Sequence, residues 1–427
     1  MIKAITGTKD ILPEEIKKWN YLVEIVNSIM KNFNYKEIRT PVFEETALFS
    51  RGIGEATDIV SKEMYTFLDR SETSVTLKPE MTASVVRAYV EHSINKQQNL
   101  SKLYYISPMF RQERPQAGRF RQFHQFGAEA LGSFSPALDA EMIILAFDIL
   151  NKLGLEGLSV KINSLGVPAS REKYKKILRT YLEDKKNNLS EESRNRMETN
   201  IMRIFDSKDE RDKAIMENAP LLMEHLDNES LEHFEEVKQI LLGAQIPYEI
   251  DPKLVRGLDY YTNTTFEITS ESVGSQNALC GGGRYDLLVE QLGGSPTPGV
   301  GFAAGMERIL LACENQNLLN LREDEVDLYI VTLNRELNKE AYSIASKFRR
   351  ENIAVEVDYL SRSVKAQMRE ANKINAKYVL FFGGEEYEEG KVTLKNMSEG
   401  DQEIYGIGDL KKIINKIGQL IAVKETK

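Results

Sequence analysis

The pattern of apolar residues changes along the chain, and this change limits the possible folds more than any other feature of the sequence. Residues 1–169 combine a strong helical pattern after Pro13 with several aromatic-rich, strand-like segments. From residue 170 to residue 242 the strand signals vanish, and the pattern becomes helical and heavily charged. Strand signals return at FEITSE (residues 266–271). The sequence therefore predicts a core in two parts, residues 1–169 and 243–320, split by a helical insertion at residues 170–242.

A charged linker, LREDEVD at residues 321–327, separates this core from a different pattern. Beyond it, the strand-like segments DLYIVTL, IAVEVDYL and YVLFFGG alternate with helical segments at residues 337–350 and 364–373. Such alternation favours a small α/β domain with a mostly parallel sheet, here over residues 327–427.

Composition excludes several classes of protein. The formal net charge of −9 argues against non-specific coating of nucleic acid, although a local arginine cluster is still able to bind RNA. No apolar run approaches the roughly 18 residues of a membrane span, and MIKAITGTKDILPEE lacks the apolar stretch of a secretory signal, so the cytoplasm is the expected compartment. The two cysteines and four histidines have no metal-binding spacing, so no protein-bound metal is predicted. His225 and His233, in the charged insertion, are expected to face solvent.

The segment FRQERPQAGRFRQFHQFGAE carries the densest set of candidate site residues. Arg111, Glu113, Arg119 and Arg121 alternate, and on strands a period of two places them on one face. Guanidinium groups bind phosphate oxygens in pairs, so this face suits a polyanion. Glu113 is suited to hold a guanidinium or to accept from a purine amino group, and Phe123 is suited to stack on a base. The alternative is a solvated hairpin held by salt bridges.

The segment LVRGLDYYT combines an arginine, a glycine and paired tyrosines. Arg256 is suited to offer a fixed positive charge to a reacting phosphate, and Tyr260 and Tyr261 are suited to line a small polar pocket. An ordinary structural strand with amphipathic tyrosines is the alternative.

Two glycine-rich segments follow. In ALCGGGRYDLL the glycines permit close approach of a ligand, but the GK[ST] ending of a phosphate loop is missing, so a tight turn is the favoured interpretation. In GVGFAAGMERI, Arg308 falls on the first turns of a helix, where close packing of strand and helix is the alternative explanation for the glycines.

The segment LKPEMTASVVRAYV has Pro79 just ahead of a helical pattern, which places Glu80 and Thr82 at the amino-terminal end of that helix. A carboxylate at this position either complements the helix dipole or receives an ammonium group from a ligand.

Together, these motifs resemble a known family. PVFEE, FRQERPQAGRFRQFHQ and GVGFAAGMERI resemble, in order, the three signature motifs of class II aminoacyl-tRNA synthetases. LVRGLDYYT and ALCGGGRYD resemble two further motifs that are particular to histidyl-tRNA synthetases. Five motifs in the right order are more specific than any one of them, and the resemblance extends from about Gly7 through the C-terminal domain.

The resemblance implies an α+β catalytic core with an antiparallel sheet flanked by helices, a helical insertion and a C-terminal α/β anticodon-binding domain. It also implies a homodimer, because the first motif usually forms the subunit interface. The implied activity is the ATP-dependent activation of L-histidine to histidyl-adenylate and its transfer to the 3′ end of tRNA(His). Magnesium is expected to accompany the phosphates.

The resemblance also implies roles for individual residues. For ATP, Arg111 holds the α-phosphate and Arg308 the γ-phosphate, Arg119 and Arg121 belong to the same anion-binding set, and the adenine lies between Glu113 and Phe123. Arg256 approaches the α-phosphate from the amino-acid side, so the implied catalytic residues are Arg111, Arg256 and Arg308. For histidine, the α-ammonium binds Glu80, Thr82 and Gln125, the imidazole is read by Glu129 and Tyr261 with Tyr260 adjacent, and Arg111 and Arg256 border the same site.

The main rival is a non-catalytic regulatory paralogue that acts with ATP phosphoribosyltransferase. Such relatives lack the C-terminal domain and have lost catalytic motif residues. Here Arg111, Arg256 and Arg308 are present, as is a complete C-terminal domain, which favours the ligase. A synthetase for another amino acid is disfavoured by the pair LVRGLDYYT and ALCGGGRYD.

Overall fold

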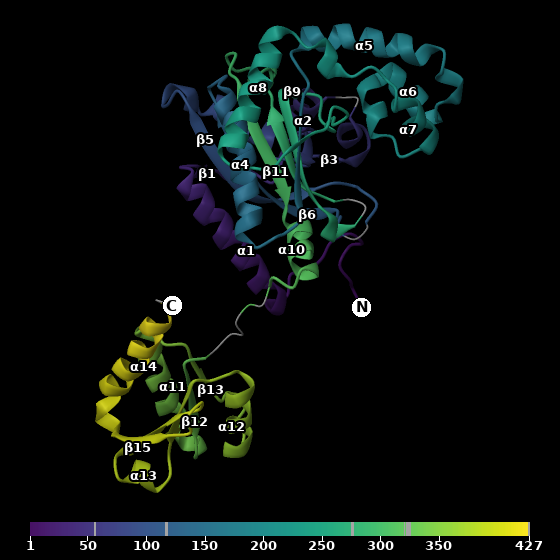
Figure 1. Ribbon diagram of the computed structural model, residues 1–427. Coiled ribbons are helices and arrows are strands. Elements are labelled where there is room, and N and C mark those ends of the chain that lie inside the picture. The colour runs from purple at the N-terminus through teal and green to yellow at the C-terminus, as the bar shows by residue number, and fades with distance from the viewer. Residues whose placement is uncertain (55–56, 116–117, 275–276, 320, 322–325, 426–427) are drawn as a thin grey trace. The chain divides into compact units, whose positions relative to one another are not determined.

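The computed structural model describes residues 1–427 except residues 55–56, 116–117, 275–276, 320, 322–325 and 426–427 (Figure 1). The chain forms two compact units, Met1–Asn320 and Leu321–Lys427. Most of the predicted charged linker, residues 322–325, lies outside the described residues. Among the described residues, no helix is both long and apolar enough to cross a membrane.

An eight-stranded sheet forms the centre of the first unit, and its central strands are antiparallel, which confirms the predicted core. Only the two edge pairs, β1 with β5 and β7 with β8, are parallel. In order across the sheet, the strands are β1 (Lys36–Glu37), β5 (Ser101–Phe110), β6 (Gln122–Leu131), β11 (Gly299–Gly305), β10 (Ala278–Arg284), β9 (Thr262–Ser270), β7 (Leu158–Ser164) and β8 (Glu249–Ile250).

Helices cover one face of this sheet and form the main apolar core with it (Figure 1). These are α1 (Pro13–Asn32), α4 (Pro136–Lys152), α8 (Asn228–Gly243) and α10 (Met306–Asn315). Helix α1 begins with a proline and two acidic residues and ends with Lys31, as the helix dipole favours. Helix α4 also begins with a proline, and the preceding Ser135 side chain accepts a hydrogen bond from the amide of Ala137.

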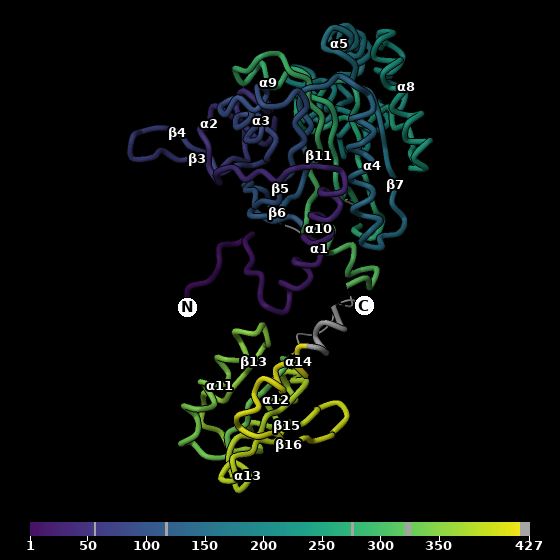
Figure 2. The backbone as a smooth tube through the Cα atoms, turned by 90° about the vertical axis from the view of Figure 1, so that its left-hand side faces the viewer, coloured from purple at the N-terminus to yellow at the C-terminus, as the bar shows by residue number. Residues whose placement is uncertain are grey.

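A second group of helices and a small second sheet belong to the opposite face of the large sheet, and the small sheet contains part of the PVFEE segment. Alternate residues of β5 point to the two faces, and Leu103, Tyr105 and Met109 pack with α3 (Thr82–Glu91). Helices α2 (Thr46–Ile53) and α9 (Leu288–Gln291) contact α3. A small antiparallel sheet, β2 (Phe43–Glu45), β4 (Ser74–Leu77) and β3 (Tyr65–Leu68), projects beside them (Figure 2). The strand predicted around Pro41 is in fact two short strands, β1 and β2, with the proline between them.

After β7 the chain is helical, with α5 (Pro168–Glu183), α6 (Glu191–Thr199), a 3₁₀ segment (Ile201–Asp206) and α7 (Glu210–Met216). Their buried side chains share one apolar cluster with α3, α9 and the Tyr260–Tyr261 pair. Helix α8 differs, because its buried face, including Phe234 and Val237, belongs to the main core beside α4. Within residues 170–242, α5 to α7 therefore pack in a cluster apart from the main core, whereas α8 packs on the main core.

The C-terminal unit is a mixed α/β domain, which confirms the predicted class. Strands β13 (Val355–Val357), β12 (Leu328–Thr332) and β14 (Tyr378–Phe382) are parallel, and β15 (Lys391–Asn396) and β16 (Gln402–Gly406) extend the sheet antiparallel. One apolar cluster joins the sheet to α11 (Asn338–Arg350) and α14 (Leu410–Glu425), and another joins it to α12 (Val364–Lys373). A short helix, α13 (Glu385–Glu388), follows β14.

Candidate functional site

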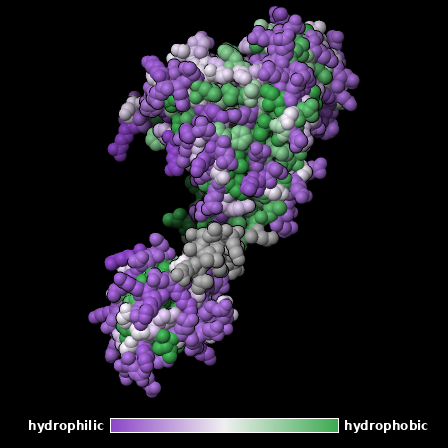
Figure 3. All heavy atoms as spheres, turned by 60° about the vertical axis from the view of Figure 1, so that its left-hand side comes forward, coloured by the Kyte–Doolittle hydropathy of each residue, from purple (hydrophilic) through white to green (hydrophobic). Residues whose placement is uncertain are grey.

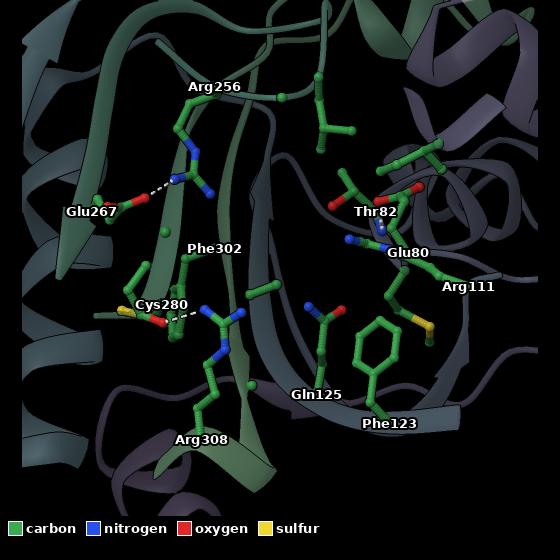
Figure 4. Close-up of a pocket in the computed structure, with 18 of the residues that line it drawn as sticks. Glu80, Thr82, Arg111, Phe123, Gln125, Arg256, Glu267, Cys280, Phe302 and Arg308 are labelled. Carbon is green, nitrogen blue, oxygen red and sulfur yellow. Dashed lines mark hydrogen bonds and ion pairs between the residues drawn. The ribbon is translucent and has the colours of Figure 1, made fainter. Parts of the chain in front are cut away.

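A cavity of about 510 Å³ opens over the central strands of the first unit (Figure 4). Its walls come from the N-terminal end of α3, β6, β9, β10, β11, the start of α10 and the loop at residues 251–261. All but two of the residues that the sequence singled out line it: Glu80, Thr82, Arg111, Glu113, Arg119, Phe123, Gln125, Arg256, Tyr260, Tyr261 and Arg308.

Arg111 and Arg308 are held on different walls of the cavity by main-chain carbonyl groups (Figure 4). Arg111 follows β5; its Nε donates to the carbonyl of Pro79 at 2.9 Å, and its guanidinium lies 5.2 Å from the centre of the Phe123 ring. Arg308, on the first turn of α10, donates to the carbonyl of Ala278 at 2.9 Å. Burial lowers the pKa of Arg308, and the neighbouring Arg119 and Arg111 add to this effect. The walls thus concentrate positive charge that a polyanionic ligand would neutralise.

The guanidinium group of Arg256 packs against strand β10 at Gly281, which has no side chain. Its Nη1 donates to the Glu267 carboxylate at 2.5 Å. A Cβ added at Gly281 would stand only 2.5–2.7 Å from the guanidinium, so a side chain at this position would displace Arg256. ALCGGGRYDLL is therefore not a tight turn, because Ala278–Arg284 is strand β10, and its glycine accommodates Arg256. The buried Nε of Arg256 has no hydrogen-bond partner among the described residues.

The N-terminal end of α3 supplies polar groups at another wall of the cavity. Both carboxylate oxygens of Glu80 accept backbone hydrogen bonds, from the amide of Thr82 at 2.8 Å and from that of Ala83 at 2.9 Å. Glu80 therefore caps the start of the helix, which is one of the two roles expected from the sequence. Burial raises the pKa of Glu80, and these backbone hydrogen bonds oppose the rise. Gln125 also lines the cavity, and its buried Oε1 has no partner among the described residues. An acceptor of this kind suits a ligand that carries N–H groups.

Glu129 lies behind the cavity wall and does not line it. Thr82 donates to its Oε1 at 2.8 Å and Tyr285 to its Oε2 at 2.5 Å. Burial raises the pKa of Glu129 to about 8, although both hydroxyl donors oppose the rise. Sequence reasoning missed Tyr285, which lines the cavity; its place directly after the glycine-rich strand was the available signal.

The arginine-rich segment departs from the predicted alternation. Strand β5 ends at Phe110 and β6 begins at Gln122, so the described residues between them, 111–115 and 118–121, lie outside both strands, and a period of two does not apply to them. Arg121 consequently does not line the cavity; its guanidinium donates to the main-chain carbonyls of Thr6 and Glu113. Arg119 does line it and donates to the Glu113 carboxylate at 3.1 Å. The salt bridges of Glu113 to Arg111 and Arg119 therefore lie in the cavity wall itself, so the salt-bridged and the anion-binding interpretations describe the same residues.

The helical insertion also contributes to the site, which the sequence did not indicate. Arg203 and Asp206, from the 3₁₀ segment, line the cavity. Arg203 pairs with Asp58 at 3.1 Å. Burial raises the pKa of Asp206 to about 6, although Arg203 and Arg256 oppose the rise. No motif could have revealed these residues, because only the fold brings the insertion to the cavity.

Two further contacts join the insertion to the loop at residues 251–261. The Asn200 side chain donates to the Asp259 carboxylate at 2.7 Å, and Arg171 of α5 donates to the carbonyl of Tyr261. This loop carries Arg256 and the Tyr260–Tyr261 pair. The insertion is therefore part of the framework of the site.

A second carboxylate fixes the start of α10 to β6. Both oxygens of Glu307 accept from the backbone amide of His124, at 2.9 and 3.0 Å, and Oε1 lies 3.0 Å from His124 Nδ1. Trp19 and His124 pack in a T-shaped arrangement, with their ring centroids 4.8 Å apart. Because Glu307 precedes Arg308, this contact sets the position of Arg308 relative to Phe123 and Gln125. The two histidines of the insertion differ from expectation: His225 packs beside Tyr174, and His233 lies 2.6 Å from the buried Asp139.

Comparisons with known proteins find relatives along nearly the whole chain. The chain matches the histidyl-tRNA synthetase family over residues 7–309 and an anticodon binding domain over residues 327–417. A histidine–tRNA ligase of Halothermothrix orenii is 48% identical over 401 residues, which cover 94% of this chain and 96% of the relative. A ligase of the same name from Listeria innocua is 48% identical over 400 residues, covering 93% and 94%. The structure of apo histidyl-tRNA synthetase from S. aureus superposes with a TM-score of 0.82 at 40% identity, covering 97% of this chain and 100% of that one.

Proposed function

From the premise that this chain belongs to the histidyl-tRNA synthetase family, we propose how its cavity carries out the two reactions of a ligase. The protein is a class II histidine–tRNA ligase, which uses ATP to activate histidine and joins the activated histidine to tRNA. This activity is preferred over the regulatory alternative, because relatives with this name match along nearly the whole chain.

We assign the ATP site to the side of the cavity formed by the arginine-rich loop and α10. Arg111 binds the α-phosphate and Arg308 the γ-phosphate, with Arg119 nearby as a further cation. The adenine stacks on Phe123, with Glu113 beside it. The contact between Arg111 and the Phe123 ring supports this assignment, because it brings a phosphate ligand and a base platform together. Arg121 is left out because it does not line the cavity.

We assign the histidine site to the side formed by α3, Gln125 and the loop at residues 251–261. The unpartnered Oε1 of Gln125 accepts from the α-ammonium, together with Thr82 and Glu80. Tyr261, with Tyr260 adjacent, reads the imidazole from the cavity wall, and Glu129 acts from behind that wall. The hydrogen bonds of Glu129 to Thr82 and Tyr285 support its part, because they connect the carboxyl group to two side chains that line the cavity.

The first reaction needs alignment more than it needs a base. A substrate carboxylate is ionised at neutral pH and attacks the α-phosphate directly, so the protein must hold the two groups together and neutralise the charge that grows on phosphorus. Arg111 and Arg256 are the groups for this task. The observation that carries the proposal is that Arg111, Arg256 and Arg308 come from distant parts of the sequence and line one cavity.

We propose that Mg²⁺ accompanies ATP. No cluster of three or more metal-ligating side chains occurs within the described ranges. Mg²⁺ typically takes one or two carboxylates and completes its shell with phosphates and water, so such a cluster is not required. Glu113 and Glu267, both in the cavity wall, fit this need. Bound there, the ion would neutralise phosphate charge.

We also propose a homodimer in the cytoplasm. The small sheet of β2, β3 and β4 exposes Phe43, Phe67 and Leu68, and Val42 beside them is exposed as well. Large apolar side chains gathered on one projecting sheet suit a subunit interface. Sedimentation equilibrium should give twice the mass of the chain, and a monomer would refute this assignment. Charging tRNA for translation fits the cytoplasm.

The test of the proposed function is ATP–pyrophosphate exchange with each of the twenty amino acids. Exchange should depend on histidine alone, because a pocket that hydrogen-bonds a ring N–H rejects analogues lacking it by roughly ten-thousandfold or more. Exchange with a different amino acid would overturn the assignment of the histidine site. Absence of exchange with all of them would favour the regulatory alternative.

A further inference from the structure

A buried ion pair lies behind the wall of the cavity, in the core that the large sheet forms with α4 and α8. Charged side chains ordinarily stay at the surface, and the face of the molecule seen in Figure 3 is mostly hydrophilic. Arg284, the last residue of β10, and Asp139 of α4 are nevertheless buried completely. Charges are retained in such a place only when hydrogen-bond partners satisfy them.

Arg284 meets this condition, because each of its five N–H groups has an acceptor. The guanidinium donates to the Asp139 carboxylate through Nε and Nη2, and to the Asp286 carboxylate through Nη1 at 3.0 Å. The remaining two N–H groups donate to the carbonyls of Ser133 at 3.1 Å and Ser135 at 3.2 Å. A buried polar network that is fully satisfied is rigid, so Arg284 fixes the end of β10 to the start of α4.

Two further side chains extend these contacts in opposite directions. His233 of α8 places Nε2 2.6 Å from Asp139 Oδ2. At the other end, the Thr262 hydroxyl donates to the Asp286 carboxylate at 3.0 Å and accepts from the Asp286 amide at 3.2 Å. Burial alone would raise the pKa of Asp139, but His233 and Arg284 hold this pKa below its usual value. These five residues, His233, Asp139, Arg284, Asp286 and Thr262, are called the Arg284 network.

The network ends at an irregular point of the large sheet. Thr262 of β9 pairs with the last residue of β10, whereas Thr265 pairs with the residue before it, so β9 carries two extra residues there. One of them, Asn263, has a φ of 41°, in the left-handed region that few residues other than glycine adopt. Bulges redirect the side chains beside them and are common next to active sites. The two hydrogen bonds between Thr262 and Asp286 hold this bulge in place.

Two tyrosines of the cavity wall are neighbours of the network in sequence. Tyr285 lies between Arg284 and Asp286, and Tyr261 directly precedes Thr262. Both tyrosines line the cavity, whereas their three neighbours do not. Successive residues of an extended chain point to opposite sides. A network fixed behind the sheet therefore sets the direction of the two rings in front of it.

The rings in front form one continuous row. Tyr260 packs against both of the other tyrosines, with centroid distances of 4.7 Å to Tyr261 and 5.7 Å to Tyr285. The Tyr285 hydroxyl donates to Glu129 at 2.5 Å. A displacement at either end of this row would consequently move the whole wall to which the imidazole site was assigned.

We propose that the Arg284 network determines the selectivity for histidine, with Arg284, Asp286 and Thr262 as positioning residues that direct Tyr261 and Tyr285 toward the imidazole. These three residues act through the tyrosines, because they do not line the cavity themselves. The proposal rests on the function given above and adds which residues hold the histidine site in shape.

The test is Thr262→Val, which keeps the shape of the side chain and removes both hydrogen bonds to Asp286. Thr264→Val is the matched control, because Thr264 is a buried threonine of the same strand whose hydroxyl has no hydrogen-bond partner among the described residues. In pyrophosphate exchange, KM for histidine should rise about tenfold or more in Thr262→Val, as expected for the loss of a hydrogen bond to a charged group. Its kcat and its KM for ATP should change less than about twofold. Thr262→Ser keeps the hydroxyl and should bind histidine almost normally, and Thr264→Val should behave like the unaltered chain.

A second measurement separates positioning from a loss of stability. The ratio of kcat/KM for histidine to kcat/KM for histidine methylated on a ring nitrogen should fall about fivefold or more in Thr262→Val, because rings that are held less firmly exclude the methyl group less well. Asp286→Asn, which changes the same contact from its other side, should lower this ratio as well.

The proposal is overturned if Thr262→Val matches Thr264→Val in both KM for histidine and the ratio. It is also overturned if the KM values for histidine and ATP rise together, since this would indicate general destabilisation. If the unaltered chain shows no histidine-dependent exchange, the function proposed above fails, and the proposal falls with it.

Discussion

Neighbours on two sides hold the guanidinium group of Arg256 in place. A substitution of this residue is therefore the most direct single-residue test of the proposed chemistry. Glu267 holds one Nη, Gly281 leaves room for the guanidinium plane, and the Nε has no partner among the described residues. Removing one preorganised donor from a site of developing charge typically costs about a hundred- to a thousandfold. Arg256→Ala should therefore slow single-turnover adenylate formation by roughly that factor. Arg256→Lys should restore only part of the rate, because a point charge cannot reproduce a planar fork.

The control for this variant is Arg121→Ala. Arg121 belongs to the arginine-rich segment but does not line the cavity, so its loss should slow adenylate formation far less. Rapid quench of the adenylate measures both variants. A wild-type rate in Arg256→Ala would make this arginine a structural residue and would disprove its catalytic role.

Glu129 is a second single residue that leads to a prediction, here on how the stability of the folded protein depends on pH. Its pKa rises from 4.5 to about 8 on folding because the group is buried, so the folded protein binds this proton more tightly than the unfolded chain does. The folded state therefore loses stability as pH rises from about 4.5 to about 8, at up to about 1.4 kcal/mol per pH unit. Glu129→Gln does not ionise and avoids this loss, while its histidine activation should fall sharply.

The measurement is the free energy of unfolding in urea at pH 5.5 and at pH 8, for the wild type and for Glu129→Gln. The difference between the two proteins should shift in favour of the variant at the higher pH. A difference that is the same at both values would show that Glu129 does not titrate in this interval. Unchanged kcat/KM for histidine in the variant would remove Glu129 from the imidazole site.

At the scale of elements, the sequence predicted the helices and strands whose formation depends on residues close together in the chain. Helix α1 and the alternating elements of the C-terminal unit follow from periodicity and end signals, and both appear in the structure. The antiparallel order of the large sheet came only from the resemblance, because β11 pairs with β6 and β9 pairs with β7, and these partners are distant in sequence. The alternation of Arg111 to Arg121 failed because a loop replaces the ends of both strands.

Prediction of the candidate site from the sequence was limited in the same way. Arg256 and Arg308 were identified from unusual residue combinations, but Tyr285, Arg203 and Asp206 have no motif of their own and reach the cavity only through the fold. The bounds predicted for the insertion, residues 170–242, stay a prediction. The charged outer face of α8 resembles the insertion, whereas its apolar face packs in the main core.

The contacts of the insertion with the loop at residues 251–261 predict an effect on histidine binding. Asn200→Ala removes the hydrogen bond to Asp259 and loosens the loop that carries Arg256 and Tyr261. A hydrogen bond to a charged group contributes about 1.5–3 kcal/mol, and water replaces part of it at this exposed position, so KM for histidine should rise about three- to tenfold. KM for ATP should change little, because the ATP site lies on other elements.

Asn195→Ala is the matched control, since Asn195 is an exposed asparagine of α6 whose side chain has no hydrogen bond to this loop among the described residues. Pyrophosphate exchange at varied histidine and varied ATP gives both constants. An equal rise of the two constants in Asn200→Ala would indicate general destabilisation and would contradict a specific role in holding the loop.

At the scale of the whole molecule, the two units have separate cores. Among the described residues, the apolar clusters of Met1–Asn320 contain no residue of the C-terminal unit, and those of Leu321–Lys427 contain none of the first. Every residue that lines the cavity belongs to the first unit. We therefore expect the activation of histidine to need only the first unit, and the anticodon-binding unit to serve tRNA.

A chain shortened to residues 1–320 tests this division. It should keep histidine-dependent pyrophosphate exchange, because the cavity and its supporting clusters remain complete. Its kcat/KM for charging full-length tRNA should fall by more than about tenfold, which corresponds to the loss of at least about 1.4 kcal/mol of tRNA binding. Charging of an acceptor-stem minihelix should fall much less, since that RNA never reaches the anticodon-binding unit. If the shortened chain charges full-length tRNA as efficiently as the complete chain, then the C-terminal unit does not serve tRNA. If instead the shortened chain folds but loses pyrophosphate exchange, the second unit supports the activation site, and the separation of the two functions is wrong.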